Sequence, residues 1–416
     1  MTVLVFYYIF PAALPLFGYT FIFTLGILGI ILYVSHKFPY TEVVPIWSVF
    51  ATMFLWSLFC TFMNNATDSF IIDYTKSQMG WFFSAYIIIY VFFRVHPKPE
   101  FHHLLYYIIA AIALQGIISV AMYLSPEAND FFTSIHKTDE LIDSKRNTTE
   151  GERLLGYGMA FFGAGITYGV GLILLSYILL TKKWNIMQIF FISLLYCFIF
   201  YVGIFSARTT ITGAFASIIL MAIILFVQKT NSGQLYKFIF FSIALFAIGY
   251  TLCYIYFSDF TDWAFEAFIN YQEKGEFRTF SSDGLDHMFV LPSNASEWIF
   301  GWGIGRFIFS DVGYTRLWMW FGLPGLCLFF YYQIMLIKPA FTRNTTLDLL
   351  LITLFIYNFV LNYKGLADIN YFLLLFTFYF LYYKYYIYTP YLYKLGKINQ
   401  SKLRHAIQAA PTSRRF

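Results

Sequence analysis

Charged residues are scarce in this chain. Asp, Glu, Lys and Arg together make up 12% of its 416 residues, whereas hydrophobic residues make up 59%. Soluble globular domains carry about 25% charged residues. The shortage of charge therefore excludes an ordinary soluble domain and indicates an integral membrane protein.

Cysteines and metal-binding patterns are scarce as well. The chain has four cysteines, each lying singly in an apolar run without paired spacing or a nearby histidine: Cys60, Cys197, Cys253 and Cys327. This distribution favours buried hydrophobic side chains over a disulfide framework or a zinc site. Asp-x-Asp pairs are absent too, so nothing in the sequence requires a divalent metal. We therefore predict neither a metal nor a cofactor.

Long apolar runs, by contrast, are abundant. A membrane-spanning helix needs about 20 mainly apolar residues. Runs of this kind predict about eleven spans, at Pro15–Ser35, Val44–Met63, Gln78–Phe93, Leu104–Leu124, Leu154–Leu180, Asn185–Phe205, Ile211–Val227, Phe238–Phe257, Arg316–Ile337, Leu347–Asn362 and Tyr371–Tyr388. Val3–Leu14 is also apolar but contains Pro11, so it is either a half-helix or a twelfth span. The expected fold is an all-α polytopic membrane protein of about 11–12 helices, with residues 1–416 as a single membrane domain.

The connections between these runs differ in charge. One alternate set holds 16 of the 27 Lys and Arg residues but only 3 of the 22 acidic residues. The positive-inside rule places this set in the cytoplasm, together with the basic tail 389–416, which we expect to contact anionic lipid. The opposite, outer face then carries the two long connections, 125–153 and 258–315, with helical character near Asp139–Lys145 and Trp298–Phe300.

The size of these connections bears on the substrate. The cytoplasmic connections are too short to hold a nucleotide, which argues against an enzyme that uses cytosolic nucleotide-activated donors. The long connections face outward, which favours substrates that arrive on the outer leaflet.

Basic side chains gather on the predicted outer face. Arg208 lies in the short gap 206–210 between two apolar runs. A charge at mid-bilayer costs about 2.5–3.5 kcal/mol, so Arg208 should lie at the membrane surface, facing water or a polar cavity. Arginine matches phosphate oxygens bidentately. We predict a diphosphate site built from Arg208, Arg153, Arg278, Arg306 and Arg316. Structural alternatives are a snorkelling Arg208 and an Arg153 paired with Glu150 or Glu152.

A transfer reaction at such a site would also need a base for the acceptor hydroxyl. The candidates nearest in sequence to these arginines are Asp286, His287 and Asp311. The alternative for His287 is an ordinary loop histidine.

Several short motifs resemble those of a known family. They are Ser206-Ala-Arg208, Phe300-Gly-Trp-Gly-Ile-Gly305, and Asp311-x-Gly-Tyr314-x-Arg-Leu leading to Phe321-Gly-Leu-Pro-Gly-Leu. Together they resemble the O-antigen polymerase (Wzy) and O-antigen ligase superfamily over about residues 150–335. The resemblance implies an inverting, metal-independent glycosyltransferase of the C fold class in the bacterial inner membrane, with its active site facing the periplasm or exterior.

The resemblance also implies roles for particular residues. Arg208 would bind diphosphate, and Arg153 would be the second family arginine. Asp311 stands where ligases typically have a histidine, which favours a polymerase of undecaprenyl diphosphate-linked repeat units. The implied partners are lipid-linked glycan donor and acceptor, membrane lipid and a chain-length regulator protein, with no nucleic acid. The alternatives are an O-antigen ligase-type transferase and a transporter of lipid-linked oligosaccharide.

Overall fold

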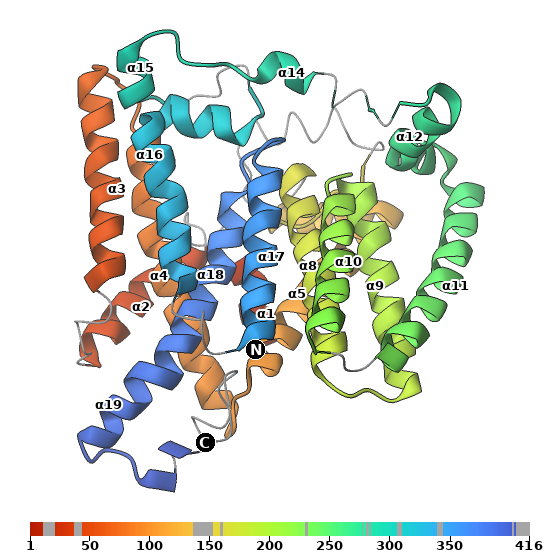
Figure 1. The fold of residues 1–416 in the computed structure, drawn as a ribbon, viewed down its shortest axis with the longest axis horizontal. Coiled ribbons are helices and arrows are strands. Elements are labelled where there is room, and N and C mark those ends of the chain that lie inside the picture. The colour runs from red at the N-terminus through yellow and green to blue at the C-terminus, as the bar shows by residue number, and fades with distance from the viewer. Residues whose placement is uncertain are drawn as a thin grey trace. The chain divides into compact units, whose positions relative to one another are not determined.

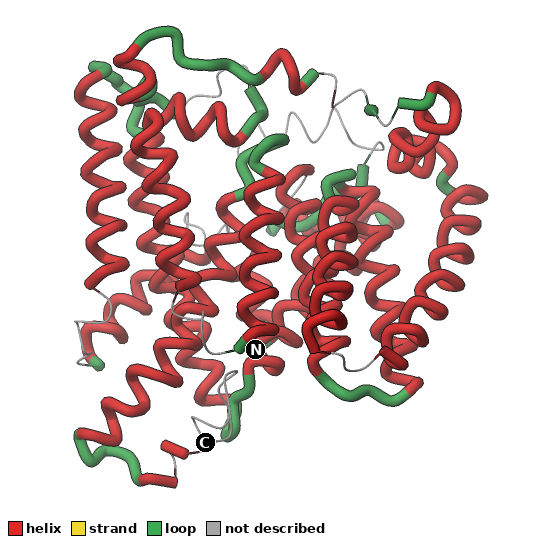
Figure 2. The backbone as a smooth tube through the Cα atoms, in the orientation of Figure 1, coloured by secondary structure: helices red, strands yellow, loops and turns green. Residues whose placement is uncertain are grey.

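The computed structural model of the 416-residue chain is built from helices joined by loops and turns (Figure 2). It describes all residues except 11–20, 37–43, 136–152, 159–160, 229–231, 277, 280–281, 283, 306–309, 339–343, 402 and 405–416, and except the side chains of 21, 228, 259, 286 and 368–371. Within the described ranges no β-strand forms. The predicted all-α fold is confirmed there.

Eight helices among the described residues are long and apolar enough to cross a membrane. They are α3 (Val44–Met63), α4 (Phe70–Val95), α5 (Phe101–Leu124), α8 (Phe161–Thr181), α9 (Ile186–Ser206), α10 (Thr210–Gln228), α11 (Ser232–Tyr256) and α16 (Gly313–Ile337). Such a set is that of a multi-pass membrane protein. Three further predicted spans are shorter helices, namely α2 (Phe21–Ser35), α17 (Thr345–Leu361) and α18 (Asp368–Tyr383).

The remaining helices are short or amphipathic. They are α1 (Thr2–Ile9), α6 (Pro126–Ser134), α12 (Ser258–Lys274), α14 (Leu285–Met288), α15 (Ala295–Phe300), the π-helical turn η3 (Lys384–Tyr388) and α19 (Thr389–Lys394). The helix-like patch predicted at Trp298–Phe300 forms α15, whereas the helix predicted near Asp139–Lys145 lies outside the described residues.

The chain folds into two compact units, each described by itself. Unit 1 comprises Met1–Phe21, His102–Phe280 and Leu349–Tyr357. Its centre is α8, which is buried along almost its whole length and packs against both α9 and α10, its neighbours in Figure 1. A Cβ at Gly213 of α10 would overlap the backbone of Gly169 of α8. Glycine therefore lets these two helices approach closely, as small residues do between membrane helices.

Unit 2 comprises Ile22–Phe101, Ser281–Asp348 and Asn358–Phe416. Within it α3, α4, α16 and α18 pack together, and α16 is broken into two parts at Gly322. The broken helix leaves carbonyl groups that need other donors. Trp56 Nε1 of α3 donates to the Phe321 carbonyl at 2.7 Å, and the Trp302 amide donates to that of Met319. The break is thus fixed by α3 and by the segment after α15.

Replacing Gly322 with alanine should destabilise unit 2. Gly322 has φ 67° and ψ −179°, a conformation that only glycine adopts readily, and a Cβ would overlap the Ile299 carbonyl oxygen. We expect a loss of about 2–5 kcal/mol, measured by thermal or denaturant unfolding of the purified protein. Gly233→Ala is the matched control, because no atom lies within 4 Å of a Cβ there. Equal stability of the two variants would contradict this explanation of the break.

Candidate functional site

Arg208 lies in the tight turn between α9 and α10, as the apolar runs predict. Helix α9 ends at Ser206 and α10 begins at Thr210. The turn is closed by backbone hydrogen bonds from Thr210 to the Ala207 carbonyl at 3.1 Å and from Ile211 to the Arg208 carbonyl at 3.0 Å. The side chain of Arg208 is only 11% exposed. Its guanidinium therefore depends on partners supplied by the protein.

Those partners come from α12. The Arg208 guanidinium forms an ion pair with Glu266, whose side chain is 27% exposed. The guanidinium carbon also lies 4.5 Å from the centroid of the Trp263 ring. In the described part of the chain, the bond to Glu266 is the one hydrogen bond of the Arg208 side chain. An arginine has five N–H donors, so most of its donors remain for a ligand.

Arg153 reaches the same indole from a different segment. It precedes Leu154, whose amide donates to the Phe205 carbonyl at 3.1 Å and so holds this segment against the end of α9. The Arg153 guanidinium carbon lies 4.8 Å from the Trp263 ring centroid and 5.8 Å from that of Phe161. Two arginines predicted from the sequence therefore meet at one tryptophan.

We call Arg153, Arg208, Trp263 and Glu266 the arginine–tryptophan cluster. Three separate segments of unit 1 contribute to it: the stretch before α8, the α9–α10 turn, and α12. Among these four side chains there are two guanidiniums and one carboxylate. Arginine pairs in a part-buried setting bind phosphate or carboxylate oxygens strongly. The cluster is therefore suited to an anion.

The sequence does not single out Trp263 and Glu266, because they lie within residues 258–315, which it predicts only as an outer-face connection. The signal was present as a helical pattern. Apolar residues recur every four positions at Phe260, Ala264 and Phe268, which is a helical periodicity. Trp263 and Glu266 are three residues apart, which places them on one side of such a helix.

Arg278 also belongs to unit 1. It is exposed and follows α12, where the Asn270 side chain donates to its backbone carbonyl at 2.9 Å. Glu150 and Glu152, the alternative partners for Arg153, lie outside the described residues, as does Arg306.

The remaining predicted residues belong to unit 2. Arg316 pairs with Asp311 at 3.1 Å, and its Nε donates to the Ser310 carbonyl at 2.9 Å. Asp286 and the exposed His287 lie on the short helix α14. Ser310 and Thr315 donate to the Met288 carbonyl, which holds the end of α14 near the start of α16. Asp311 and Arg316 are thus brought together, near α14. That they converge with the arginine–tryptophan cluster stays a prediction.

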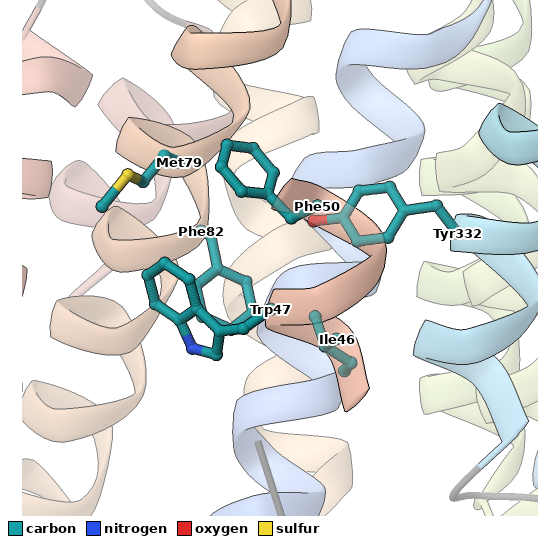
Figure 3. A pocket seen from close by; sticks show the side chains of 6 residues that line it. All are labelled: Ile46, Trp47, Phe50, Met79, Phe82 and Tyr332. Atoms are coloured by element: carbon teal, nitrogen blue, oxygen red, sulfur yellow. The ribbon is translucent and has the colours of Figure 1, made fainter. Parts of the chain in front are cut away.

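A pocket in unit 2 is lined by apolar side chains from α3, α4 and α16 (Figure 3). The lining residues are Ile46, Trp47, Phe50, Met79, Phe82 and Tyr332. None of them is a predicted site residue. The predicted site residues therefore lie outside this pocket. Among the described residues, no group of three or more His, Cys, Asp or Glu side chains is arranged to hold a metal ion.

Comparison of the chain with protein-family models, with curated proteins and with solved structures finds no match.

Proposed function

We propose that this protein polymerises undecaprenyl diphosphate-linked oligosaccharide repeat units into a surface polysaccharide, O-antigen or capsule. The observation that carries the proposal is the meeting of Arg153 and Arg208 at Trp263, at the ends of apolar helices. A lipid-linked diphosphate has its lipid in the membrane and its charge at the surface. A part-buried pair of arginines at a helix–helix turn matches that distribution of charge.

In this mechanism the cations act on the leaving group. The acceptor hydroxyl attacks the anomeric carbon of the donor glycan, the bond from that carbon to the diphosphate oxygen breaks, and undecaprenyl diphosphate departs. Negative charge then grows on the diphosphate, where Arg208 and Arg153 stabilise it. Glu266 holds Arg208 in place before the donor binds. Arg278, Arg306 and Arg316 are secondary cations in the proposal.

The proton of the acceptor hydroxyl needs a base, and Asp311 or Asp286 is proposed for this role, with His287 as a further candidate. Arg316 already binds the Asp311 carboxylate, so an acceptor hydroxyl would have to share that carboxylate or displace the arginine. The presence of an aspartate at position 311 supports polymerase over ligase within the resembled superfamily. We place the site on the periplasmic or outer face of a bacterial inner membrane, in a fold like that of the C-class glycosyltransferases.

The direct test is incubation of the purified protein with a lipid-linked repeat unit as the only substrate. We expect products of several repeat lengths, with release of undecaprenyl diphosphate and no loss of activity in EDTA. A requirement for a second, different acceptor would instead indicate a ligase. Vectorial movement of the lipid-linked sugar without new glycosidic bonds would indicate a transporter. Either result would reject the proposal.

A further inference from the structure

A second group of basic side chains lies in unit 2, far along the chain from the arginine–tryptophan cluster. It consists of His36 just after α2, Arg94 in the last turn of α4, and Lys384 just after α18, and we call it the basic cluster. Each member follows or ends an apolar helix. In the charge pattern of the sequence, all three belong to the connections predicted to face the cytoplasm.

Tyrosine rings connect the members of the basic cluster. Arg94 donates to the Tyr90 hydroxyl at 3.0 Å, and its guanidinium carbon lies 5.3 Å from the centroid of that ring. The His36 ring lies 5.5 Å from the Tyr90 ring and 6.1 Å from the Tyr388 ring. The Lys384 ammonium lies 4.1 Å from the centroid of the Tyr388 ring. The three basic groups are thus close neighbours arranged around two aromatic rings.

The positive charges of Arg94 and Lys384 act on the neighbouring His36. Burial lowers the pKa of His36, and the positive charges of Lys384 and then Arg94 lower it further. Neither Arg94 nor Lys384 forms an ion pair with an acidic side chain of the described residues. Like charges gathered at a membrane boundary without a carboxylate are unfavourable, and aromatic faces offset only part of that cost.

We propose that the basic cluster binds a phosphate group, either the phosphodiester of an anionic phospholipid or free inorganic phosphate. An oxyanion would neutralise the repulsion between Arg94 and Lys384. Arginine offers a planar fork and lysine a mobile point charge, a combination that suits tetrahedral phosphate. Val34 and Val95 are exposed apolar side chains beside His36 and Arg94, and they provide adjacent surface for acyl chains.

The site is tested on purified full-length protein by native mass spectrometry with phosphatidylglycerol, with phosphatidylcholine and with inorganic phosphate. We expect phosphatidylglycerol to bind in preference to phosphatidylcholine. Arg94→Gln and Lys384→Gln should each weaken phosphatidylglycerol binding by about tenfold, because each removes a charge-assisted hydrogen bond. Lys183→Gln, at an exposed lysine between α8 and α9 in unit 1, is the matched control and should bind as the unchanged protein does.

The arms of the experiment distinguish the two sources of phosphate. Displacement of phosphatidylglycerol by millimolar inorganic phosphate would assign the site to free phosphate, and resistance to that displacement would assign it to lipid. Arg94 is exposed, so Arg94→Gln keeps the test valid if Lys384→Gln fails to fold. Binding that is equal for both lipids, or unchanged in Arg94→Gln, would overturn the proposal.

Discussion

Arg208→Ala should abolish the formation of long glycan chains while leaving the protein in the membrane. Removing one preorganised donor from a developing negative charge typically lowers turnover about 100- to 1,000-fold. Arg208→Lys should retain part of the activity, because it keeps the charge but loses the planar fork. Chain length on a glycan gel and turnover of the purified protein are the measurements. Arg404→Ala, an exposed arginine near the carboxyl end, is the control and should leave both unchanged.

The ion pair between Arg208 and Glu266 makes a second variant necessary. Arg208→Ala leaves Glu266 without this partner in a part-buried position, so a loss of activity could follow from a disturbed structure. The double variant Arg208→Ala/Glu266→Gln also removes the carboxylate charge at position 266. If Arg208 binds diphosphate, the double variant stays inactive although its melting temperature recovers. A double variant that regains a normal glycan ladder would exclude Arg208 from the mechanism.

The apolar helices are the part of the fold that the sequence predicts best. The predicted span Val44–Met63 coincides with α3 at both ends, because Pro45 suits the first turn of a helix and the polar Asn64 follows the apolar run. The run before α8 was less informative. Leu154 and Tyr157 are apolar and buried, yet they precede the helix, since Gly158 has φ 71° and the Leu154 amide bonds across to Phe205. The hydropathy of these residues thus indicates that they are buried, but it does not show that their backbone is outside the helix.

Amphipathic helices, and contacts between residues distant in the sequence, are harder to predict from the sequence. Helix α4 begins at Phe70 rather than Gln78, because Asp73 in its first turn accepts a hydrogen bond from Ser69 and favours a helix start that hydropathy does not detect. The pair Asp311–Arg316 is local, and its spacing was visible in the sequence. The Arg208–Glu266 pair joins residues 58 positions apart, and no pattern within one sequence predicts such a contact.

Trp263→Ala should lower polymerisation by about 10- to 100-fold with the protein still folded. Both guanidiniums lie against this ring, and each cation–π contact contributes about 0.5–2 kcal/mol to the position of its arginine. Without the ring, Arg153 and Arg208 lose their common support, although neither charge is removed. The displaced guanidiniums no longer match the charge that grows on the leaving diphosphate, so we expect kcat to fall more than KM for the lipid-linked repeat unit rises.

Aromatic replacements separate this role from simple packing. Trp263→Phe keeps a ring face for both cations and should retain most of the activity, whereas Trp263→Leu fills similar apolar space without a π-system and should behave like Trp263→Ala. Steady-state kinetics of the three variants, with melting temperatures measured in parallel, provide the comparison. If Trp263→Leu were as active as Trp263→Phe, the indole would serve only as a packing element, and the arginine–tryptophan cluster would need another explanation.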